Sequence, residues 1–437
     1  MRNIICCTSD YSGLGFALLA QRQGDNVILA TRMNDDEEAI DEFEKIGENM
    51  IEKVDLDDAV KELSGKGFYW IFDQNHLQEY ADRLRAMGEK VFGSTEFTNK
   101  MEHDRQFAVD IMEQAGLKSP ETIEFTSAEE GMQYLDDNHD RAFVFKPNDS
   151  ACSYLTFVPS NWDDTRANRE LFHYMKGLTE GTDDYVLQER KKGIEINVEA
   201  WFYNGKPFFS FLGLENKRKL NRDSGCNVGC SQDVVMVLPL DKPLVTQTIG
   251  KLYPYLESIK YTGFMDVNVI YCDNEFYYLE SCGRYGYNSH PNLFYSLAKD
   301  TFGNIMCDFM DGKVEGFYEK FRKGFGASVS LYTDHPRMGI PFFADERVAD
   351  KFYHYDCYLD EDGDMLLAGY DKKEGQVGVM CSFGYTIEEA ATEAMRIIDV
   401  YEELNFPDMA YRSDLNTTDY HTSPIKRHDA LGHLFFI

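Results

Sequence analysis

The sequence lacks the features that mark zinc-binding, secreted and membrane-spanning proteins. Its ten cysteines form no Cys-x-x-Cys unit and no histidine cluster stands near them, which argues against a zinc site. No apolar run reaches the roughly 18 residues that span a bilayer. No signal peptide follows Met1. We therefore expect a soluble cytoplasmic protein with reduced thiols and no membrane contact.

Basic residues are scarce relative to acidic ones. The 437 residues include 44 Lys+Arg against 76 Asp+Glu, which gives a formal net charge of −32 at pH 7. A surface this acidic repels phosphate backbones, and it therefore argues against non-specific binding of nucleic acid. Anionic small molecules are still acceptable ligands, because a few Lys and Arg side chains can converge in one cleft.

No internal repeat or low-complexity segment is present, and the hydrophobic pattern changes twice along the chain. Residues 1–100 alternate short apolar runs with helical patterns, which predicts an open parallel α/β sheet. One long helix is predicted over residues 99–115, at the start of the region 101–325. The rest of that region is predicted to be an antiparallel-rich α+β block. Residues 326–437 carry three further strands and a helix over 386–404. The sequence therefore predicts three domains with these boundaries.

One acidic run has the spacing of a calcium loop. Asp360, Asp362 and Asp364 occupy alternate positions, like the first ligands of such a loop. Met365 stands where the loop needs glycine, and Asp371 stands where it needs glutamate. We therefore predict an acidic hairpin turn at this point.

A glycine-containing loop directly follows the first predicted strand and opens a helix. Its residues Ser12, Gly13 and Gly15 can present backbone N–H groups to an anion at the helix N-terminus. The loop has no third glycine of a dinucleotide fingerprint, and the second strand ends without an acidic ribose ligand. Classical NAD binding is therefore disfavoured, whereas a phosphate or carboxylate site and a plain tight turn both fit.

Polar residues at the ends of strands in the middle region suggest a nucleotide site. Lys146 ends an apolar predicted strand and is followed by the polar run 148–151. Its side chain is either a phosphate ligand or a solvated lysine at the edge of the sheet. Asn268 and Glu280 lie on consecutive strands that pair across a short turn, with Arg284 just beyond. Hard oxygen ligands beside a basic group are typical of a Mg²⁺–triphosphate site.

These elements, in this order, resemble the ATP-grasp fold and specifically the phosphoribosylamine–glycine ligases of purine synthesis. The resemblance covers essentially the whole chain. It implies a Rossmann-like pre-ATP-grasp domain over 1–100, an ATP-grasp domain over 101–325 with a lid at about 120–190, and a small α+β domain over 326–437. The motifs that carry it are residues 91–95, 217–218, 223–229, 261–264, 278–286, 375–381 and 384–390.

The resemblance implies roles for individual residues around ATP and Mg²⁺, or Mn²⁺ in its place. Arg105 and Lys146 would hold phosphates, although a helix-surface position explains Arg105 equally well. Glu280 with Asn268 would bind the metal ion. The other implied ligands are Gln188 and Glu189 for adenine, Glu195 for ribose, Arg284 for the transferring phosphoryl group, Lys217, Asp223, Gly225 and Asn227 for the carboxylate substrate, and Ser12, Gly13, Gly15, Asn75, Tyr287 and Asn288 for the acceptor.

The chain departs from the family pattern mainly on the acceptor side. The Gly-rich lid is replaced by residues 148–154, which contain no glycine, and the second metal ligand, an Asn, is Cys282. A neutral thiol is a poor Mg²⁺ ligand, for which Asn268 can partly compensate. The phosphoribosyl loop aligns with residues 11–17 and keeps none of its charged residues, and the segments at 72–76 and 284–289 are also rewritten.

The sequence therefore leads to three hypotheses. The first is an ATP-dependent carboxylate–amine ligase that activates an amino acid, glycine above all, and transfers it to an amine other than phosphoribosylamine. The second is the ordinary phosphoribosylamine–glycine ligase with diverged contacts. The third is a catalytically silent ATP-grasp protein with a binding or regulatory role. Each would be a monomer or a homodimer.

Overall fold

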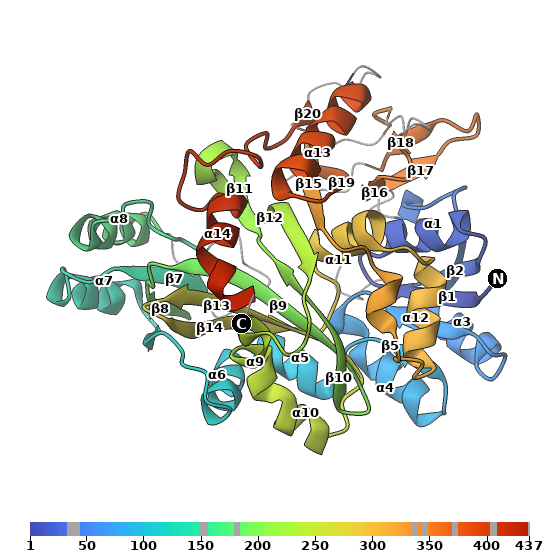
Figure 1. Ribbon diagram of the computed structural model, residues 1–437, viewed down its shortest axis with the longest axis horizontal. Coiled ribbons are helices and arrows are strands. Elements are labelled where there is room, and N and C mark those ends of the chain that lie inside the picture. The colour runs from blue at the N-terminus through green and yellow to red at the C-terminus, as the bar shows by residue number, and fades with distance from the viewer. Residues whose placement is uncertain are drawn as a thin grey trace.

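The computed structural model describes residues 1–32, 44–147, 156–178, 184–333, 339–341, 348–368, 375–402 and 409–435. A parallel sheet forms the N-terminal part, at the right of Figure 1, with strand order β3-β2-β1-β4-β5. The helices packed with it are α1 (Leu14–Arg22), α3 (Leu56–Leu63) and α4 (Gln78–Ala86). The strands are β1 (Asn3–Thr8), β2 (Asn26–Thr31), β3 (Glu52–Asp55), β4 (Tyr69–Phe72) and β5 (Lys90–Phe92).

The predicted parallel α/β sheet is confirmed, because every strand pair in it is parallel. Neither β3 nor α3 was expected from the sequence. The strand β3 contains a single apolar residue, Val54, so it carries no hydrophobic pattern of its own. It forms because its backbone pairs with the apolar strand β2.

The long helix expected over residues 99–115 is two helices, α5 (Glu96–His103) and α6 (Arg105–Gln114). The chain breaks at Asp104, whose backbone angles are φ −106° and ψ 90°. The carboxylate of Asp104 accepts a hydrogen bond from the Phe107 backbone N–H at 3.0 Å and so caps α6. The prediction of a single helix was wrong because Asp104 has a non-helical backbone and starts a second helix as its N-cap.

A small antiparallel sheet, β6-β8-β7, projects to the left in Figure 1 with two helices packed on it. Its elements are β6 (Thr122–Phe125), α7 (Ala128–Asp137), β7 (Phe143–Pro147), α8 (Asp164–Lys176) and β8 (Tyr185–Glu189). It has an apolar core of its own, which includes Leu135, Phe143 and Leu187. The glycine-free segment expected to replace the lid loop, residues 148–154, lies outside the described residues.

The largest sheet has ten strands, with the main order β14-β13-β9-β10-β12-β15-β19-β16. Its strands include β9 (Ile194–Tyr203), β10 (Lys206–Gly213), β11 (Asn216–Leu220), β12 (Ser224–Val237), β13 (Gly263–Cys272) and β14 (Glu275–Cys282). The others are β15 (Phe325–Thr333), β16 (Phe352–His354), β19 (Gln376–Gly384) and β20 (Met409–Ala410). The sheet therefore continues across residue 325, where the sequence suggested a domain boundary.

Two local expectations about loops have different outcomes. Residues 224–229, part of the motif at 223–229, look like a glycine-containing loop in sequence, but they begin β12 and pair with β11. The acidic hairpin turn is confirmed between β17 (Cys357–Leu359) and β18 (Met365–Leu367). There Asp360 accepts hydrogen bonds from the backbone N–H groups of Asp362 and Asp364 at 3.0 and 2.8 Å.

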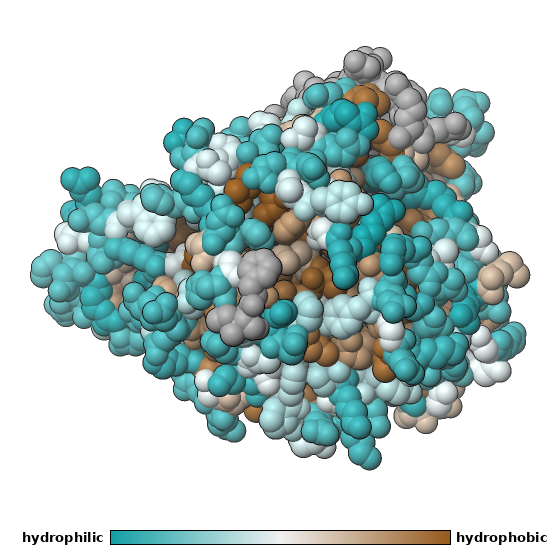
Figure 2. Space-filling model, in the orientation of Figure 1, coloured by the Kyte–Doolittle hydropathy of each residue, from teal (hydrophilic) through white to brown (hydrophobic). Residues whose placement is uncertain are grey.

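Helices cover the large sheet and fill the junction with the N-terminal part. They are α9 (Pro243–Thr246), α10 (Tyr253–Ser258), α11 (Ser289–Asn292), α12 (Phe302–Met310), α13 (Ile387–Glu402) and α14 (Pro424–Phe435). Within the described ranges, no helix has both the length and the apolar character needed to cross a bilayer. Figure 2 shows a mostly hydrophilic face, with apolar residues visible towards its centre.

An aromatic core lies where the large sheet meets the N-terminal part. Trp201 on β9 is fully buried and stacks on Phe264 of β13, with ring centroids 4.5 Å apart. Phe264 in turn contacts Phe92 of β5 at 4.1 Å and Tyr285, the residue after Arg284, at 5.4 Å. Because Tyr285 packs in this core, the backbone of the preceding residue, Arg284, is held in place.

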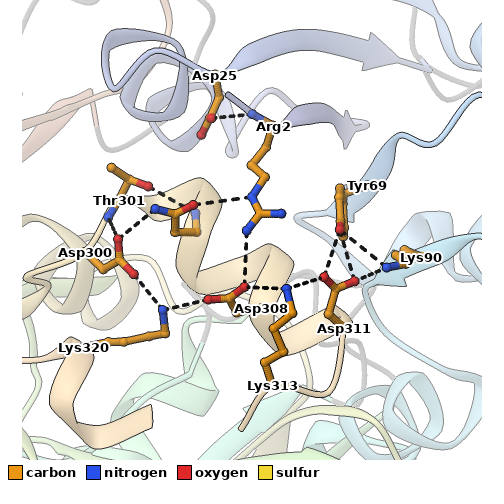
Figure 3. A network of polar contacts seen from close by, with 11 residues as sticks. Arg2, Asp25, Tyr69, Lys90, Asp300, Thr301, Asp308, Asp311, Lys313 and Lys320 are labelled. Carbon is orange, nitrogen blue, oxygen red and sulfur yellow. Dashed lines mark hydrogen bonds and ion pairs between the residues drawn. The ribbon is translucent and has the colours of Figure 1, made fainter. Parts of the chain in front are cut away.

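A network of ion pairs ties the N-terminal sheet to α12 (Figure 3). The guanidinium of Arg2 lies 3.3 Å from Asp308, and Lys313 lies within 3.2 Å of Asp308 and 3.0 Å of Asp311. Asp311 also accepts a hydrogen bond from Tyr69 at 3.1 Å. Asp308 and Asp311 are partly buried, with 18% and 12% of their side chains exposed, whereas Lys313 is exposed. The network therefore links the N-terminal sheet to α12 at a partly covered junction.

Candidate active site

Lys217 of β11 joins two carboxylates that the sequence placed at a nucleotide site. Its Nζ lies 2.8 Å from Glu195 Oε1 and 3.0 Å from Glu280 Oε1. The charge of Lys217 is the main reason that the pKa of Glu280 falls to about 2, with further contributions from Lys146 and Arg105. Glu280 is therefore ionised over the whole physiological pH range.

Three cations surround this carboxylate, and they influence one another. Burial lowers the pKa of Lys146 to about 8, and the neighbouring charge of Arg105 lowers it further in the same direction. The Nε of Arg105 is buried and has no hydrogen-bond partner in the described structure. Crowded cations with an unsatisfied donor form an environment that favours an anion such as a phosphate group.

The two expected metal ligands are direct cross-strand neighbours. Asn268 of β13 pairs with Glu280 of β14 in the sheet register, so both side chains lie on the same face. Asn268 donates its Nδ2–H to Asp266 Oδ2 at 3.3 Å, which leaves its amide oxygen to act as a ligand. These two oxygens suit Mg²⁺, which in proteins commonly takes one or two side-chain ligands and completes its shell with phosphate and water.

Cys282 lies beside these residues but cannot replace a hard ligand. Its thiol contacts Asp266 Oδ2 at 3.6 Å, and burial, with the nearby Asp266 charge, raises its pKa well above the usual value. The thiol therefore stays protonated. In the part of the chain that the structure describes, no three His, Cys, Asp or Glu side chains are arranged to hold a metal ion. A metal ion here would depend on the ligands that a bound nucleotide brings.

The residues expected near adenine lie at the end of β8. Gln188 is buried and donates from Nε2 to Thr122 Oγ1 at 3.1 Å. Glu189 pairs with Lys191 at 2.9 Å, and its backbone N–H donates to the Glu121 carbonyl at 2.7 Å. Both side chains therefore have partners within the protein.

The residues expected at the acyl-phosphate centre contact other parts of the chain. Asp223 lies 2.9 Å from the buried guanidinium of Arg412. Gly225 is the second residue of β12 and has φ +80°. Asn227 donates to the backbone carbonyl of Thr156 at 3.3 Å, next to the small sheet. These contacts connect the β11–β12 hairpin to the small sheet and to the C-terminal segment.

The glycine-containing loop before α1 binds a carboxylate of the chain itself. The backbone N–H of Gly13 donates to Asp73 Oδ2 at 2.6 Å, and the Ser12 hydroxyl donates to the same oxygen at 3.2 Å. Burial raises the pKa of Asp73 to about 7, and the charge of Asp10 contributes further. Gly15 has a packing role, because a Cβ there would lie 2.6 Å from the Tyr353 ring.

Arg284 is held between an acidic and an aromatic side chain. Its Nε and Nη2 lie 3.1 and 3.0 Å from Glu102 Oε1, and its guanidinium carbon is 5.0 Å from the centre of the Tyr287 ring. Asn75 is buried and donates to the other oxygen of Glu102. Tyr287 is 42 % exposed, whereas Asn288 is fully buried and donates to Ser330 Oγ at 3.0 Å. Of these predicted acceptor residues, Tyr287 alone presents a large exposed surface.

The sequence analysis missed a group of buried polar residues on the same face of the large sheet. Glu199 accepts a hydrogen bond from Trp201 Nε1 at 2.6 Å and lies 3.1 Å from His290 Nε2. The Nδ1 of His290 accepts the Gly286 backbone N–H at 2.8 Å, so the ring proton is on Nε2. The alternation of Glu195, Asn197 and Glu199 along β9 indicates this polar face in the sequence, because every second residue of a strand points to the same face of the sheet.

A parallel N-terminal sheet, a small antiparallel sheet and a large sheet with a cation-rich face together have the arrangement of the ATP-grasp fold. Residues 103–286 match the family described as phosphoribosylglycinamide synthetase, ATP-grasp (A) domain. Residues 103–286 therefore form an ATP-grasp domain.

Within that class the chain is similar to phosphoribosylamine–glycine ligases. It is 23% identical to the enzyme of that name from Fusobacterium nucleatum over 368 residues, which cover 77% of this chain and 80% of the relative. The crystal structure of the Thermotoga maritima ligase superposes with a TM-score of 0.66 at 17% identity, covering 94% of this chain and 99% of that one.

A second solved structure shares the fold and contains a nucleotide. It is the biotin carboxylase domain of the Hydrogenobacter thermophilus 2-oxoglutarate carboxylase in complex with MgADP. It superposes with a TM-score of 0.61 at 11% identity and covers 100% of this chain and 99% of that one.

Proposed function

We propose that this protein is an ATP-dependent carboxylate–amine ligase whose amine acceptor differs from phosphoribosylamine. The carboxylate substrate is an amino acid, glycine above all, and the acceptor is a small-molecule amine. The observation that carries the proposal is a contrast between the nucleotide side and the acceptor side of the candidate site. The cations and the Asn268–Glu280 pair remain on the nucleotide side, while a carboxylate, Asp73, occupies the anion-binding loop on the acceptor side.

On the nucleotide side, Lys146 and Arg105 bind the phosphates of ATP, while Glu280 and the Asn268 amide oxygen hold Mg²⁺. The metal ion supplies charge neutralisation between the phosphates when it is bound. Lys217, which already bridges Glu195 and Glu280, holds these two carboxylates in place beside the phosphates. Gln188 and Glu189 lie at the adenine end.

The reaction proceeds in two steps, and the acyl phosphate formed in the first step is consumed in the second. The carboxylate of the amino acid attacks the γ-phosphorus, which forms an acyl phosphate and releases ADP. The unprotonated amine of the acceptor then attacks the acyl carbon and forms the C–N bond, while the C–O bond to phosphate breaks. The nitrogen loses one proton, which the released inorganic phosphate takes up. The protein mainly positions the groups and neutralises charge, because phosphoryl transfer needs little covalent chemistry from side chains. Arg284 stabilises the transferring phosphoryl group.

The acceptor side argues against a phosphorylated substrate. A phosphate dianion at the N-terminus of α1 needs free backbone N–H groups, and the Gly13 N–H is bound to Asp73. Asp10 adds a second carboxylate next to this loop. The exposed ring of Tyr287 offers a stacking surface instead. We therefore propose an acceptor with a ring and hydroxyl or amide groups that carries less phosphate than phosphoribosylamine.

The ordinary phosphoribosylamine–glycine ligase is the second candidate, because the curated relatives carry that name. ADP release measured with panels of amino acids and amines separates the candidates. We expect stimulation by glycine together with an amine that is not phosphoribosylamine. Stimulation by phosphoribosylamine alone, or rescue of a purine auxotroph that lacks this ligase, would establish the second candidate. No stimulation by any pair would establish the catalytically silent protein.

We further propose that the three regions 1–100, 101–325 and 326–437 are the domains of this ligase, with the second and third joined through the large sheet that continues across residue 325. The enzyme would work in the cytoplasm as a monomer or homodimer. Limited proteolysis and size-exclusion chromatography with light scattering test the boundaries and the assembly.

A further inference from the structure

A pocket of about 550 Å³, open to solvent, lies at the end of the large sheet where β15 begins and β19 ends. Aromatic rings and positive charges line it, from Phe321, Phe383 and Tyr385 and from Lys299, Arg322 and Lys323. In the sheet order β19 is five strands from β13, which carries Asn268, so the pocket lies roughly 24 Å along the sheet from the proposed metal ligands. It is therefore separate from the candidate active site.

Backbone pairing brings the cations of this pocket together from two parts of the chain. The backbone N–H of Arg322 donates to the carbonyl of Leu297 at 2.7 Å, and the backbone N–H of Lys299 donates to the carbonyl of Lys320 at 2.8 Å. These two hydrogen bonds hold the two segments side by side. The cations therefore converge because of the fold, although they are distant in the sequence.

The three cations have no carboxylate partner. Within the part of the chain that the structure describes, no ion pair joins any of them to an acidic side chain. The neighbouring Lys320, by contrast, lies 2.7 Å from Asp300 and 2.9 Å from Asp308 (Figure 3). The chain carries a net charge of −32, so carboxylates are abundant. Unpaired cations gathered at one pocket of such a protein favour an anion from outside.

Arg322 is supported by an aromatic ring and keeps its donors. Its guanidinium carbon lies over the Phe383 ring, 5.2 Å from the ring centre. A guanidinium over a ring retains its N–H donors, and two of them can bind one carboxylate or phosphate group. The contact with Phe383 also limits the side-chain freedom that Arg322 would lose on binding.

Tyr385 adds an exposed ring beside this cation. It is 75% exposed, compared with 42% for Tyr287. Its ring contacts Phe383 edge-on, with centroids 5.2 Å apart, and its backbone N–H donates to Glu389 Oε2 at 2.8 Å. An exposed aromatic ring that is held in place in this way offers a stacking surface.

Acidic groups limit the charge that a ligand can carry. Glu319 lines the same pocket. Glu389 and Glu393 line an adjoining pocket of about 410 Å³, which shares Arg322 with the first one. These carboxylates repel a polyanion such as a triphosphate, whereas a single anionic group fits beside the three cations.

We propose that this pocket binds a small aromatic anion, that is, a planar ring that bears one carboxylate or phosphate group. The anionic group contacts Arg322 and the adjacent lysines, and the ring lies against Tyr385. The site is additional to the proposed ligase site, because none of its residues belongs to the nucleotide side or to the acceptor side.

The test uses the full chain with benzoate and phenyl phosphate as probes, in the absence of ATP and amines. Saturation-transfer NMR of the ring protons gives the dissociation constant of each probe at constant ionic strength. Arg322→Gln removes the cation that lies over the ring, and Tyr385→Ser removes the exposed ring. Arg169→Gln is the matched control, because the exposed Arg169 of α8 likewise lies over a ring, 5.0 Å from the centre of Phe172.

We expect at least one probe to bind the parent and Arg169→Gln equally well, and the tighter probe identifies the anionic group. Both pocket variants should bind it about tenfold more weakly, because each loses one of the two contacts. Acetate and inorganic phosphate, which lack a ring, should displace it only at concentrations about tenfold higher. Both variants change exposed residues and should unfold at the temperature of the parent.

Three results would overturn the proposal. The first is equal binding by all four proteins, and the second is equally strong competition by the anions without a ring. The third is that neither probe binds the parent; a changed oligomeric state of the pocket variants would then assign this surface to contacts between copies of the chain. The assay needs no turnover, so failure of the proposed ligase function leaves its result unchanged.

Discussion

Asp73 Oδ2 accepts the backbone N–H of Gly13 at 2.6 Å, so a carboxylate of the protein occupies the N-terminus of α1. In open α/β sheets this edge is where a ligand binds, and a helix N-terminus favours a negative charge. Here the group at that position is the side chain of Asp73, in the segment that follows β4. The finding links the diverged loop sequence to a change in what the acceptor side can bind.

Asp73 should make stability depend on pH. Its folded pKa of about 7 lies above the ordinary value of 3.8, so between these pH values the folded state holds a proton that the unfolded state has lost. The free energy of unfolding therefore decreases as pH rises through this window, by an amount on the order of 2–4 kcal/mol. Asp73→Asn should remove this decrease. Urea unfolding of parent and variant at pH 5 and 7.5 measures it, and parallel pH profiles would contradict the prediction.

Glu280 should be needed for metal-dependent nucleotide binding. Glu280→Gln removes one of two hard side-chain ligands and leaves Lys217 with Glu195 alone, so the Mg²⁺-dependent part of ATP affinity should fall about tenfold or more. Glu275→Gln on the same strand is the control, because Glu275 is an exposed residue that pairs with Lys118. Calorimetric titration with ATP, in the presence and absence of Mg²⁺, measures the ATP affinity of the parent and of both variants. Equal affinities in parent and Glu280→Gln would place the metal elsewhere.

Some of this arrangement could be predicted from sequence because it depends on local pattern. The alternating apolar residues of β13 and β14, joined by a short turn, fixed both strands and therefore the Asn268–Glu280 pair. The same logic gave the parallel N-terminal sheet and the acidic hairpin at Asp360. In each case the paired strands are close in the sequence, or both carry a strong hydrophobic pattern.

The features that could not be predicted depend on contacts between distant parts of the chain. Asp73 meets Gly13 across 60 residues, and Arg412 meets Asp223 across 189. Residues 224–229 look like a loop by composition but form a strand through pairing with β11. No local signal distinguishes Asp233, which is completely buried, from an ordinary strand aspartate on a solvated edge.

Lys146 should make nucleotide affinity depend on pH near 8. Its pKa is lowered to about 8, so the free protein loses this positive charge as pH rises through that value. ATP affinity should be constant below about pH 7 and should decline above pH 8. Lys146→Arg should flatten the decline, because a guanidinium stays protonated. Titrations of ATP from pH 6.5 to 9.5 measure the profile.

The control for this profile is Lys299→Arg, at an exposed lysine outside the cation cluster. It should reproduce the pH profile of the parent. A profile of Lys146→Arg that bends at the same pH as the parent would show that another group titrates, and Lys146 would then have no part in phosphate binding.

Removing the carboxylate from the loop should create the anion site that the chain lacks. In Asp73→Ser the Gly13 N–H and the Ser12 hydroxyl lose their acceptor, and the N-terminus of α1 becomes available to a phosphate group. Calorimetric titration with ribose 5-phosphate should show no binding to the parent and measurable binding to the variant. Asp362→Ser, at an exposed turn, should behave as the parent does. Binding of ribose 5-phosphate to the parent would mean that the acceptor side accepts a phosphate despite Asp73, and the argument for a changed acceptor would fail.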